Sequence, residues 1–163
     1  MLKRILPLLL VLLCLACAVK AGDAYENAQF VAVLPDGFEP VSDTKFACFA
    51  PYGDPLLSSS ITFFTTESNW YFDRFTVADY EAALRDAGYE IVSFGPVTAC
   101  KVDGFDARRI VCTVQIDQGA HTLIVYAVSA DCTYFFTLLN RDTDSYMEAF
   151  DAMMETVQLK GVR

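Results

Sequence analysis

The hydrophobic positions of the chain change their period along its length. Apolar residues that alternate with polar ones, or run continuously between Gly, Pro, Asp and Asn, predict extended strands. Seven such runs occur, at residues 30–34, 45–50, 58–66, 89–102, 109–116, 121–128 and 132–139. Gly95-Pro96 interrupts one of them, which predicts a broken or edge strand at that point.

Two segments show the helical period instead. Thr76 to Asp79 resembles a capping box, and the apolar residues after it recur at helical spacing up to Gly88, a residue suited to ending a helix. Near the C-terminus, spacings of four, three and four residues predict a second helix with an apolar stripe of Tyr146, Phe150, Met153 and Val157.

The order of these elements predicts an α+β fold. Successive strands joined by short loops pair antiparallel. The strands at 121–128 and 132–139 are apolar on both faces, which is typical of central strands covered on both sides. We therefore expect one domain over residues 22–163, with a single antiparallel sheet of about six to seven strands flanked by two helices.

Residues 1–21 have the organisation of a signal peptide. Lys3 and Arg4 precede an apolar run from Ile5 to Val19, and Val19-Lys20-Ala21 offers small residues for cleavage before Gly22. The run is short for a hydrocarbon core of about 30 Å, so removal is favoured over a retained membrane anchor. We expect the domain to lie outside the cytoplasm of a bacterium.

Within this leader, Leu15-Ala16-Cys17 resembles the end of a bacterial lipobox, in which the cysteine becomes the acylated first residue. Cys14 stands three positions earlier, where an aliphatic residue is usual. Two outcomes therefore stay open, release after Ala21 and membrane anchoring through Cys17, and the pattern slightly favours release.

Composition and charge exclude several classes of protein. The chain has 163 residues, of which 54% are hydrophobic and 20% charged, a composition that excludes a disordered chain. Its 21 acidic and 12 basic residues give a net charge of −9. A nucleic-acid binder needs a basic surface, so this class is excluded as well, while the acidic charge identifies no particular partner.

The cysteines beyond the leader are Cys48, Cys100, Cys112 and Cys132. An even number in an exported domain is compatible with two disulfides. If Val102 and Ile110 pair across the turn between them, Cys100 faces Cys112, and Cys48 and Cys132 form the second pair. Four buried free thiols are the alternative.

No arrangement of ligands predicts a metal or cofactor. No close Cys pair or Cys/His cluster has the spacing of a zinc site beyond the leader. Asp142 and Asp144 resemble the start of a calcium loop, but Met147 replaces the required Gly and Met153 the required Glu. We interpret the two aspartates as helix-capping residues.

His121 is the only histidine. A hydrolase relay would need a nearby Ser and Asp, and neither Ser58-Ser59-Ser60 nor Ser129 lies in a Gly-x-Ser-x-Gly turn. We interpret His121 as a solvated residue at a strand end and expect no enzymatic activity. A small extracytoplasmic hydrolase that uses His121 is the alternative.

The segment Asn69–Phe75 contains four aromatic residues and an arginine. Trp, Tyr and Arg are favoured at binding hot spots, so Trp70, Tyr71, Phe72 and Arg74 are candidates for contacting a protein or small-molecule partner. The alternative is that these side chains pack beneath the first helix and complete the core. A third possible role is a structural subunit that oligomerises through a second apolar sheet face.

The chain resembles the PsbP-like superfamily, which includes the DcrB-like bacterial lipoproteins. The resemblance rests on the element order, on FVAVLPDGF at residues 30–38, on VDGFDA at 102–107 and on the aromatic strand before the closing helix. It implies a PsbP-like α+β fold and an accessory role outside the cytoplasm, and it assigns no binding residue.

Overall fold

The computed structural model describes residues 23–41, 47–51, 58–67, 69, 71–141 and 146–162. The expected leader with Cys17, and Trp70 in the aromatic segment, lie outside these residues.

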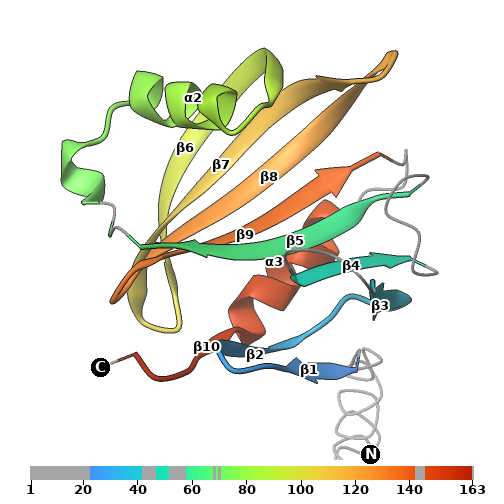
Figure 1. The fold of residues 1–163 in the computed structure, drawn as a ribbon, viewed down its shortest axis with the longest axis vertical. Helices are drawn as coiled ribbons and strands as arrows, with labels where there is room; N and C mark the ends of the chain where they lie inside the picture. Colours follow the sequence, from blue (N-terminus) through green and yellow to red (C-terminus); the bar gives the residue numbers. More distant parts are fainter. Residues whose placement is uncertain are drawn as a thin grey trace, which may run out of the picture.

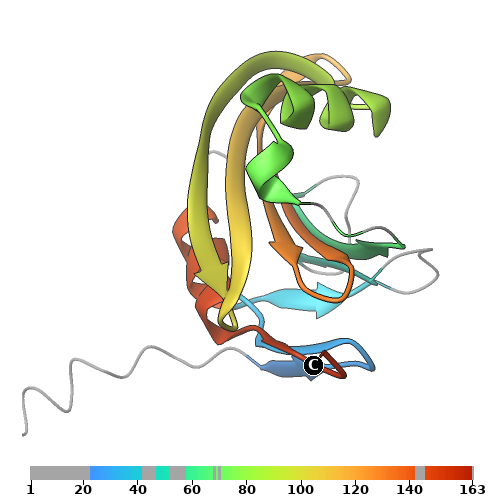
Figure 2. The ribbon, with the colours of Figure 1, turned by 90° about the vertical axis from the view of Figure 1, so that its left-hand side faces the viewer.

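The main element is a seven-stranded antiparallel sheet (Figure 1). Its spatial order is β3 (Phe38–Pro40), β4 (Ala47–Pro51), β5 (Ser60–Thr66), β9 (Thr133–Asn140), β8 (Gly119–Ser129), β7 (Phe105–Ile116) and β6 (Glu90–Val102). The curved sheet lies between helix α2 (Val77–Asp86) and helix α3 (Met147–Thr156) (Figure 2). This arrangement confirms the predicted α+β fold class.

A second, three-stranded sheet was not predicted. It consists of β1 (Ala24–Glu26), β2 (Phe30–Val33) and β10 (Gln158–Leu159), with β2 in the middle. The strand predicted at 30–34 therefore pairs outside the main sheet. Strands of two or three residues are too short to show a period, which explains why β1, β3 and β10 escaped prediction.

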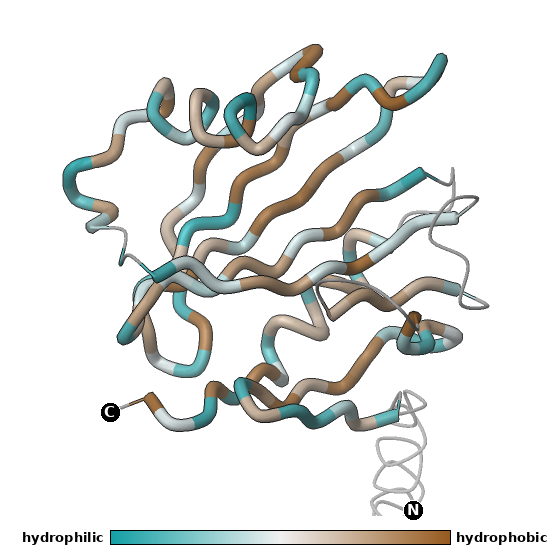
Figure 3. The backbone as a smooth tube through the Cα atoms, viewed as in Figure 1, coloured by the Kyte–Doolittle hydropathy of each residue, from teal (hydrophilic) through white to brown (hydrophobic). Residues whose placement is uncertain are grey.

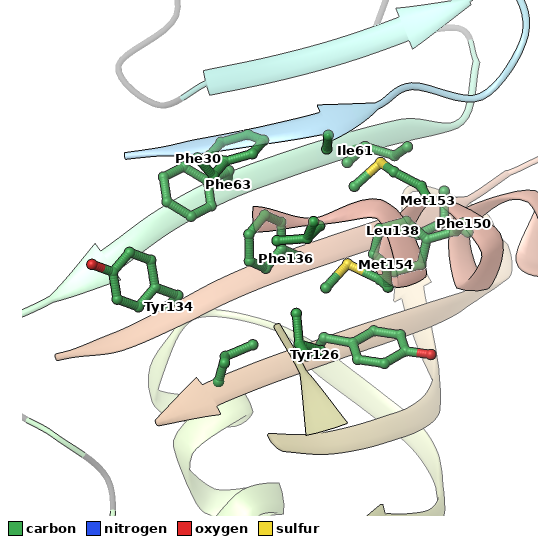
Figure 4. Packing of buried hydrophobic residues seen from close by; sticks show 14 of the residues in the cluster. Phe30, Ile61, Phe63, Tyr126, Tyr134, Phe136, Leu138, Phe150, Met153 and Met154 are labelled. Atoms are coloured by element: carbon green, nitrogen blue, oxygen red, sulfur yellow. The ribbon is translucent and has the colours of Figure 1, made fainter. Parts of the chain in front are cut away.

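The two faces of the main sheet carry separate hydrophobic cores. On the α3 face, aromatic and methionine side chains from β2, β5, β8, β9 and α3 meet, among them Phe30, Phe63, Phe136, Phe150, Met153 and Met154 (Figure 4). On the α2 face, the buried residues include Tyr80, Leu84, Ile110, Cys112, Leu123 and Val125. Figure 3 shows the matching concentration of hydrophobic residues in β8 and β9. Both faces are therefore covered, as their apolar pattern predicts.

The hairpin between β6 and β7 corrects the expected cysteine pairing. Asp103 and Gly104 have φ values of +49° and +81°, so they form a two-residue turn of the type that favours Gly at its second position. Val102 then lies opposite Phe105, which places Cys100 opposite Ala107 rather than Cys112. Our prediction assumed a longer turn and was wrong.

Neither predicted disulfide is present, because the four cysteines beyond the leader are free thiols. Cys100 packs against the core on the α3 face, whereas Cys112 belongs to the core on the α2 face. Cys48 lies opposite Thr62 in the sheet, and Cys132 lies between β8 and β9. Burial raises the pKa of the Cys112 thiol to about 11.

Helix α2 begins at the predicted capping box. The Thr76 N–H and hydroxyl donate to Asp79 Oδ2 over 2.6 and 2.7 Å, and the Asp79 N–H donates back to Thr76 Oγ1 over 3.4 Å. These hydrogen bonds lower the pKa of Asp79. Among the described helices, none combines the length and the apolar character needed to cross a bilayer.

Candidate functional site

The aromatic segment enters α2 through a short 3-10 helix, η2 (Phe72–Arg74), and its side chains separate into two groups. Phe72 is only 7% exposed, and its ring lies 6.4 Å from that of Tyr80 on α2. Tyr71 is 60% exposed. The Arg74 guanidinium carbon lies 5.2 Å from the centre of the Tyr71 ring, a cation–π contact. We call Tyr71 and Arg74 the exposed pair.

The core interpretation holds for Phe72, and the exposed Tyr71 and Arg74 stay candidates for contacting a partner. Phe72 completes the core beneath the helix, whereas Tyr71 and Arg74 face solvent. The split follows from the tight 3-10 turn, which points adjacent side chains in different directions. Trp70 was named with these residues and is not among those described.

Arg108 on β7 supports the segment from below. Its guanidinium carbon lies 4.9 Å from the centre of the Phe72 ring, and its Nη1 donates to the Ala107 carbonyl over 2.9 Å. Burial raises the pKa of the neighbouring Tyr80 hydroxyl, and Arg108 opposes that rise. The buried half of the segment is thus held between α2 and an arginine on the sheet.

Asn69 fixes the other end of the segment to the turn between β8 and β9. Its Nδ2 donates to the Ala130 carbonyl over 2.7 Å, and its Oδ1 accepts from the Ser129 hydroxyl over 2.6 Å. Both ends of the exposed pair's backbone are therefore anchored. Sequence reasoning missed Asn69 and Arg108, because their partners lie about 60 and 36 positions away in the chain and leave no local pattern.

A polar cluster lies on the opposite face of the sheet. Asp151 on α3 accepts from Arg109 Nε and Nη2 over 2.9 and 2.8 Å, and from the Tyr126 hydroxyl over 2.7 Å. The hydrogen bond to Asp151 raises the pKa of Arg109, and burial followed by Asp151 raises the pKa of Tyr126. The bidentate geometry connects α3 to β7 and β8, which is a structural role.

His121 lies near the start of β8, opposite Val114. Its imidazole folds back over Gly119, where an added Cβ would lie only 2.7 Å from Nε2. Within the described part of the chain, no hydroxyl or carboxylate hydrogen-bonds to this ring. The described residues also contain no group of three or more side chains placed to hold a metal ion. The described geometry therefore does not supply the partners that a histidine-dependent hydrolase would require.

No model of a protein family matches the sequence. None of the curated proteins matches it either. Several solved structures are similar in fold. Cyanobacterial PsbP (CyanoP) from Synechocystis sp. PCC 6803 has a TM-score of 0.61 and 14% sequence identity, over 88% of this chain and 95% of that one.

Two other structures show the same likeness. LpqN, involved in cell envelope biogenesis of Mycobacterium tuberculosis, has a TM-score of 0.56 and 14% identity over 87% of each chain. A protein from Bacteroides thetaiotaomicron has a TM-score of 0.55 and 13% identity over 86% of this chain, which spans only 49% of that one. At these identities the similarity is one of fold.

Proposed function

We propose that this chain, whose fold is PsbP-like, is a non-enzymatic binding or accessory domain that works outside the cytoplasm. The leader-like residues 1–21 support the location. Two proteins of similar fold, cyanobacterial PsbP (CyanoP) and LpqN, which is involved in cell envelope biogenesis, are compatible with an accessory role. Because fold alone does not determine function, the proposal needs a specific binding surface, which we assign to Tyr71 and Arg74.

The proposal depends on one observation: the exposed pair is held in place by the residues around it. An exposed Tyr beside an Arg offers a large apolar ring, a hydroxyl and a charge, which together characterise interface hot spots. Asn69 and the buried Phe72 hold the backbone around Tyr71 in place. A surface ordered before binding loses less conformational entropy when a partner binds. We infer that the exposed pair contacts a protein partner.

Two other roles are less well supported. The hydrolase alternative would need partners for His121 that the described residues do not supply. The third role assumed an open apolar sheet face, and α2 with the segment before it packs on that face. Release after Ala21 and anchoring through Cys17 are both compatible with the proposal. Mass spectrometry of the native N-terminus distinguishes Gly22 from an acylated Cys17.

The proposal can be tested in the producing cell with an affinity-tagged chain. The double variant Tyr71→Ser with Arg74→Ser should lose the protein that copurifies with the wild type. Val92→Ser is the matched control, because Val92 on β6 is 58% exposed and lies outside the exposed pair. Equal loss from the double variant and the control, or no loss from either, would contradict the assignment of the binding surface.

A further inference from the structure

The outer edges of the two sheets differ in how they are protected. An unpaired edge exposes backbone N–H and C=O groups to any passing strand, and native proteins usually shorten or block such edges. β3 has three residues and ends in Pro40, and β1 also has three. On β10, the carboxylate of Asp103 accepts the Leu159 N–H over 2.8 Å. These three edges are short, and one of them is capped.

β6 is the exception. It is a terminal strand of the main sheet, 13 residues long, and within the described chain no strand pairs with its outer side. The irregularities that blunt it lie between Ile91 and Val97, around Gly95-Pro96. From Val97 to Val102 its register with β7 is unbroken. We call residues 97–101 the open window.

The tight turn determines which backbone groups of the open window point outward. Val102 and Phe105 flank a two-residue turn, so they form a hydrogen-bonded pair. In an antiparallel ladder such pairs alternate with pairs that do not exchange hydrogen bonds. The N–H and C=O groups of Val97, Ala99 and Lys101 therefore point away from β7, toward solvent.

The side chains of the open window also permit a close approach. Thr98 and Ala99 are small and exposed. No acidic residue occurs from Ile91 to Val102, although the chain carries 21 acidic residues. The one charge there, on Lys101, is paired with Asp106 over 2.8 Å. A second copy of this acidic chain can thus approach this edge without bringing carboxylates together on the pairing strands.

We propose that two copies of the chain pair antiparallel along their open windows, about a two-fold axis at Ala99. Ala99 then lies opposite Ala99 of the second copy, and Val97 lies opposite Lys101, so three pairs exchange two hydrogen bonds each. Sliding the strands by two residues leaves only two such pairs. A further slide in one direction places Lys101 against Lys101, which is repulsive. The contact is small, so the dimer forms and dissociates with concentration.

Sedimentation equilibrium over a dilution series tests the pairing. Proline at position 99 removes an N–H that β7 does not use, so Ala99→Pro blocks the outer edge and leaves the hairpin ladder intact. We expect the wild type and the Ala99→Ser control to dimerise, and the dissociation constant of Ala99→Pro to rise at least tenfold. A wild type that is monomeric at every concentration would overturn the proposal. An extended peptide of another protein would then be the alternative occupant of this edge.

A crosslink tests the register without relying on the proline variant. The proposed axis places Thr98 opposite Cys100 of the second copy, in a pair whose Cα atoms are about 4.5 Å apart, within disulfide range. Oxidised Thr98→Cys should therefore give a covalent dimer joined between positions 98 and 100. Adding Cys100→Ser should abolish it, and Ala82→Cys on exposed α2 should not link to Cys100. Failure to form the 98–100 link, or a Cys100–Cys100 link in the wild type, would overturn the register.

Discussion

The two helices occupy opposite faces of one sheet and are held there by different means. α2 begins at a capping box whose three hydrogen bonds all lie between Thr76 and Asp79, residues three apart. α3 has no side-chain cap at Tyr146. Instead, Asp151 connects it to β7 and β8, and Phe150, Met153 and Met154 are buried.

This difference separates local from long-range determinants. The start of α2 depends only on neighbouring residues. The segment that precedes this helix carries the exposed pair. The position of α3 depends on partners 25 and 42 residues away in the chain. We infer that the α3 face holds most of the stability, and that the α2 face carries the binding surface.

Phe150→Ala should have the largest effect. Phe150 is fully buried, and truncating such a ring removes its apolar contacts and leaves a cavity, at a cost of about 3–5 kcal/mol of unfolding free energy. Leu84→Ala on α2 is the matched change and should cost less, about 2 kcal/mol, because Leu84 retains some exposure. Urea denaturation of both variants checks this. A greater loss at Leu84 would reverse the proposed division.

Alkaline pH should lower the unfolding free energy through Cys112, which is buried in the core on the α2 face. The pKa of Cys112 rises from 9.0 to about 11 on burial, so the unfolded chain loses this proton first. The stability contribution is complete below pH 9 and disappears as pH rises toward 11, by about 2 to 3 kcal/mol. Cys112→Ala should lose less stability between pH 9 and 11 than the wild type. If the unfolding free energies of the two proteins fell in parallel with pH, burial would not raise the pKa of the Cys112 thiol.

Asp151→Asn should weaken the attachment of α3. The variant keeps the side-chain shape but replaces the charge that Arg109 contacts with two donors. Because the pair is partly exposed, we expect a loss of about 1–2 kcal/mol, measured by chemical denaturation. Glu148→Gln makes the same chemical change at an exposed position of α3 and should stay within about 0.5 kcal/mol of the wild type. Equal losses of stability in the two variants would contradict the structural role of the Asp151 cluster.

Thr76→Ala should have the smallest effect, about 1 kcal/mol, the usual cost of a lost N-cap. It also has a pH signature. Hydrogen bonds from Thr76 lower the pKa of Asp79 below 3.8, so their contribution is present above about pH 4 and is lost as pH falls further. The variant should lose less stability than the wild type on acidification from pH 4 to 2. If the variant and the wild type lost the same stability between pH 4 and 2, the cap would not act through Asp79.

The sequence predicted those parts of the fold that depend on local patterns. The period of two identified the long strands, and the Thr76–Asp79 spacing identified where α2 begins. The β6–β7 register was predicted wrongly because Phe105 to Arg108 were assigned to the turn. The segment does show the alternation of a strand, because Phe105 and Ala107 lie in the core on the α3 face, whereas Arg108 contacts Phe72 on the α2 face. The prediction overlooked this alternation because it extended the turn beyond Asp103-Gly104.

The candidate site was predicted in part for a related reason. The clustering of aromatic residues identified the segment, but no local pattern distinguished the buried Phe72 from the exposed Tyr71. The 3-10 turn separates the two side chains, and Asn69 and Arg108 hold the segment in place through the β8–β9 turn and through β7. Contacts at such separations depend on the assembled sheet.

Site-specific photocrosslinking in the producing cell tests most directly whether the α2 side binds a partner. A photoreactive phenylalanine analogue would replace Tyr71 in one variant and Ala152, an exposed residue of α3, in another. We predict a discrete crosslinked protein from position 71 and none from position 152. The same adduct from both positions, or an adduct from position 152 alone, would contradict the assignment of binding to the exposed pair.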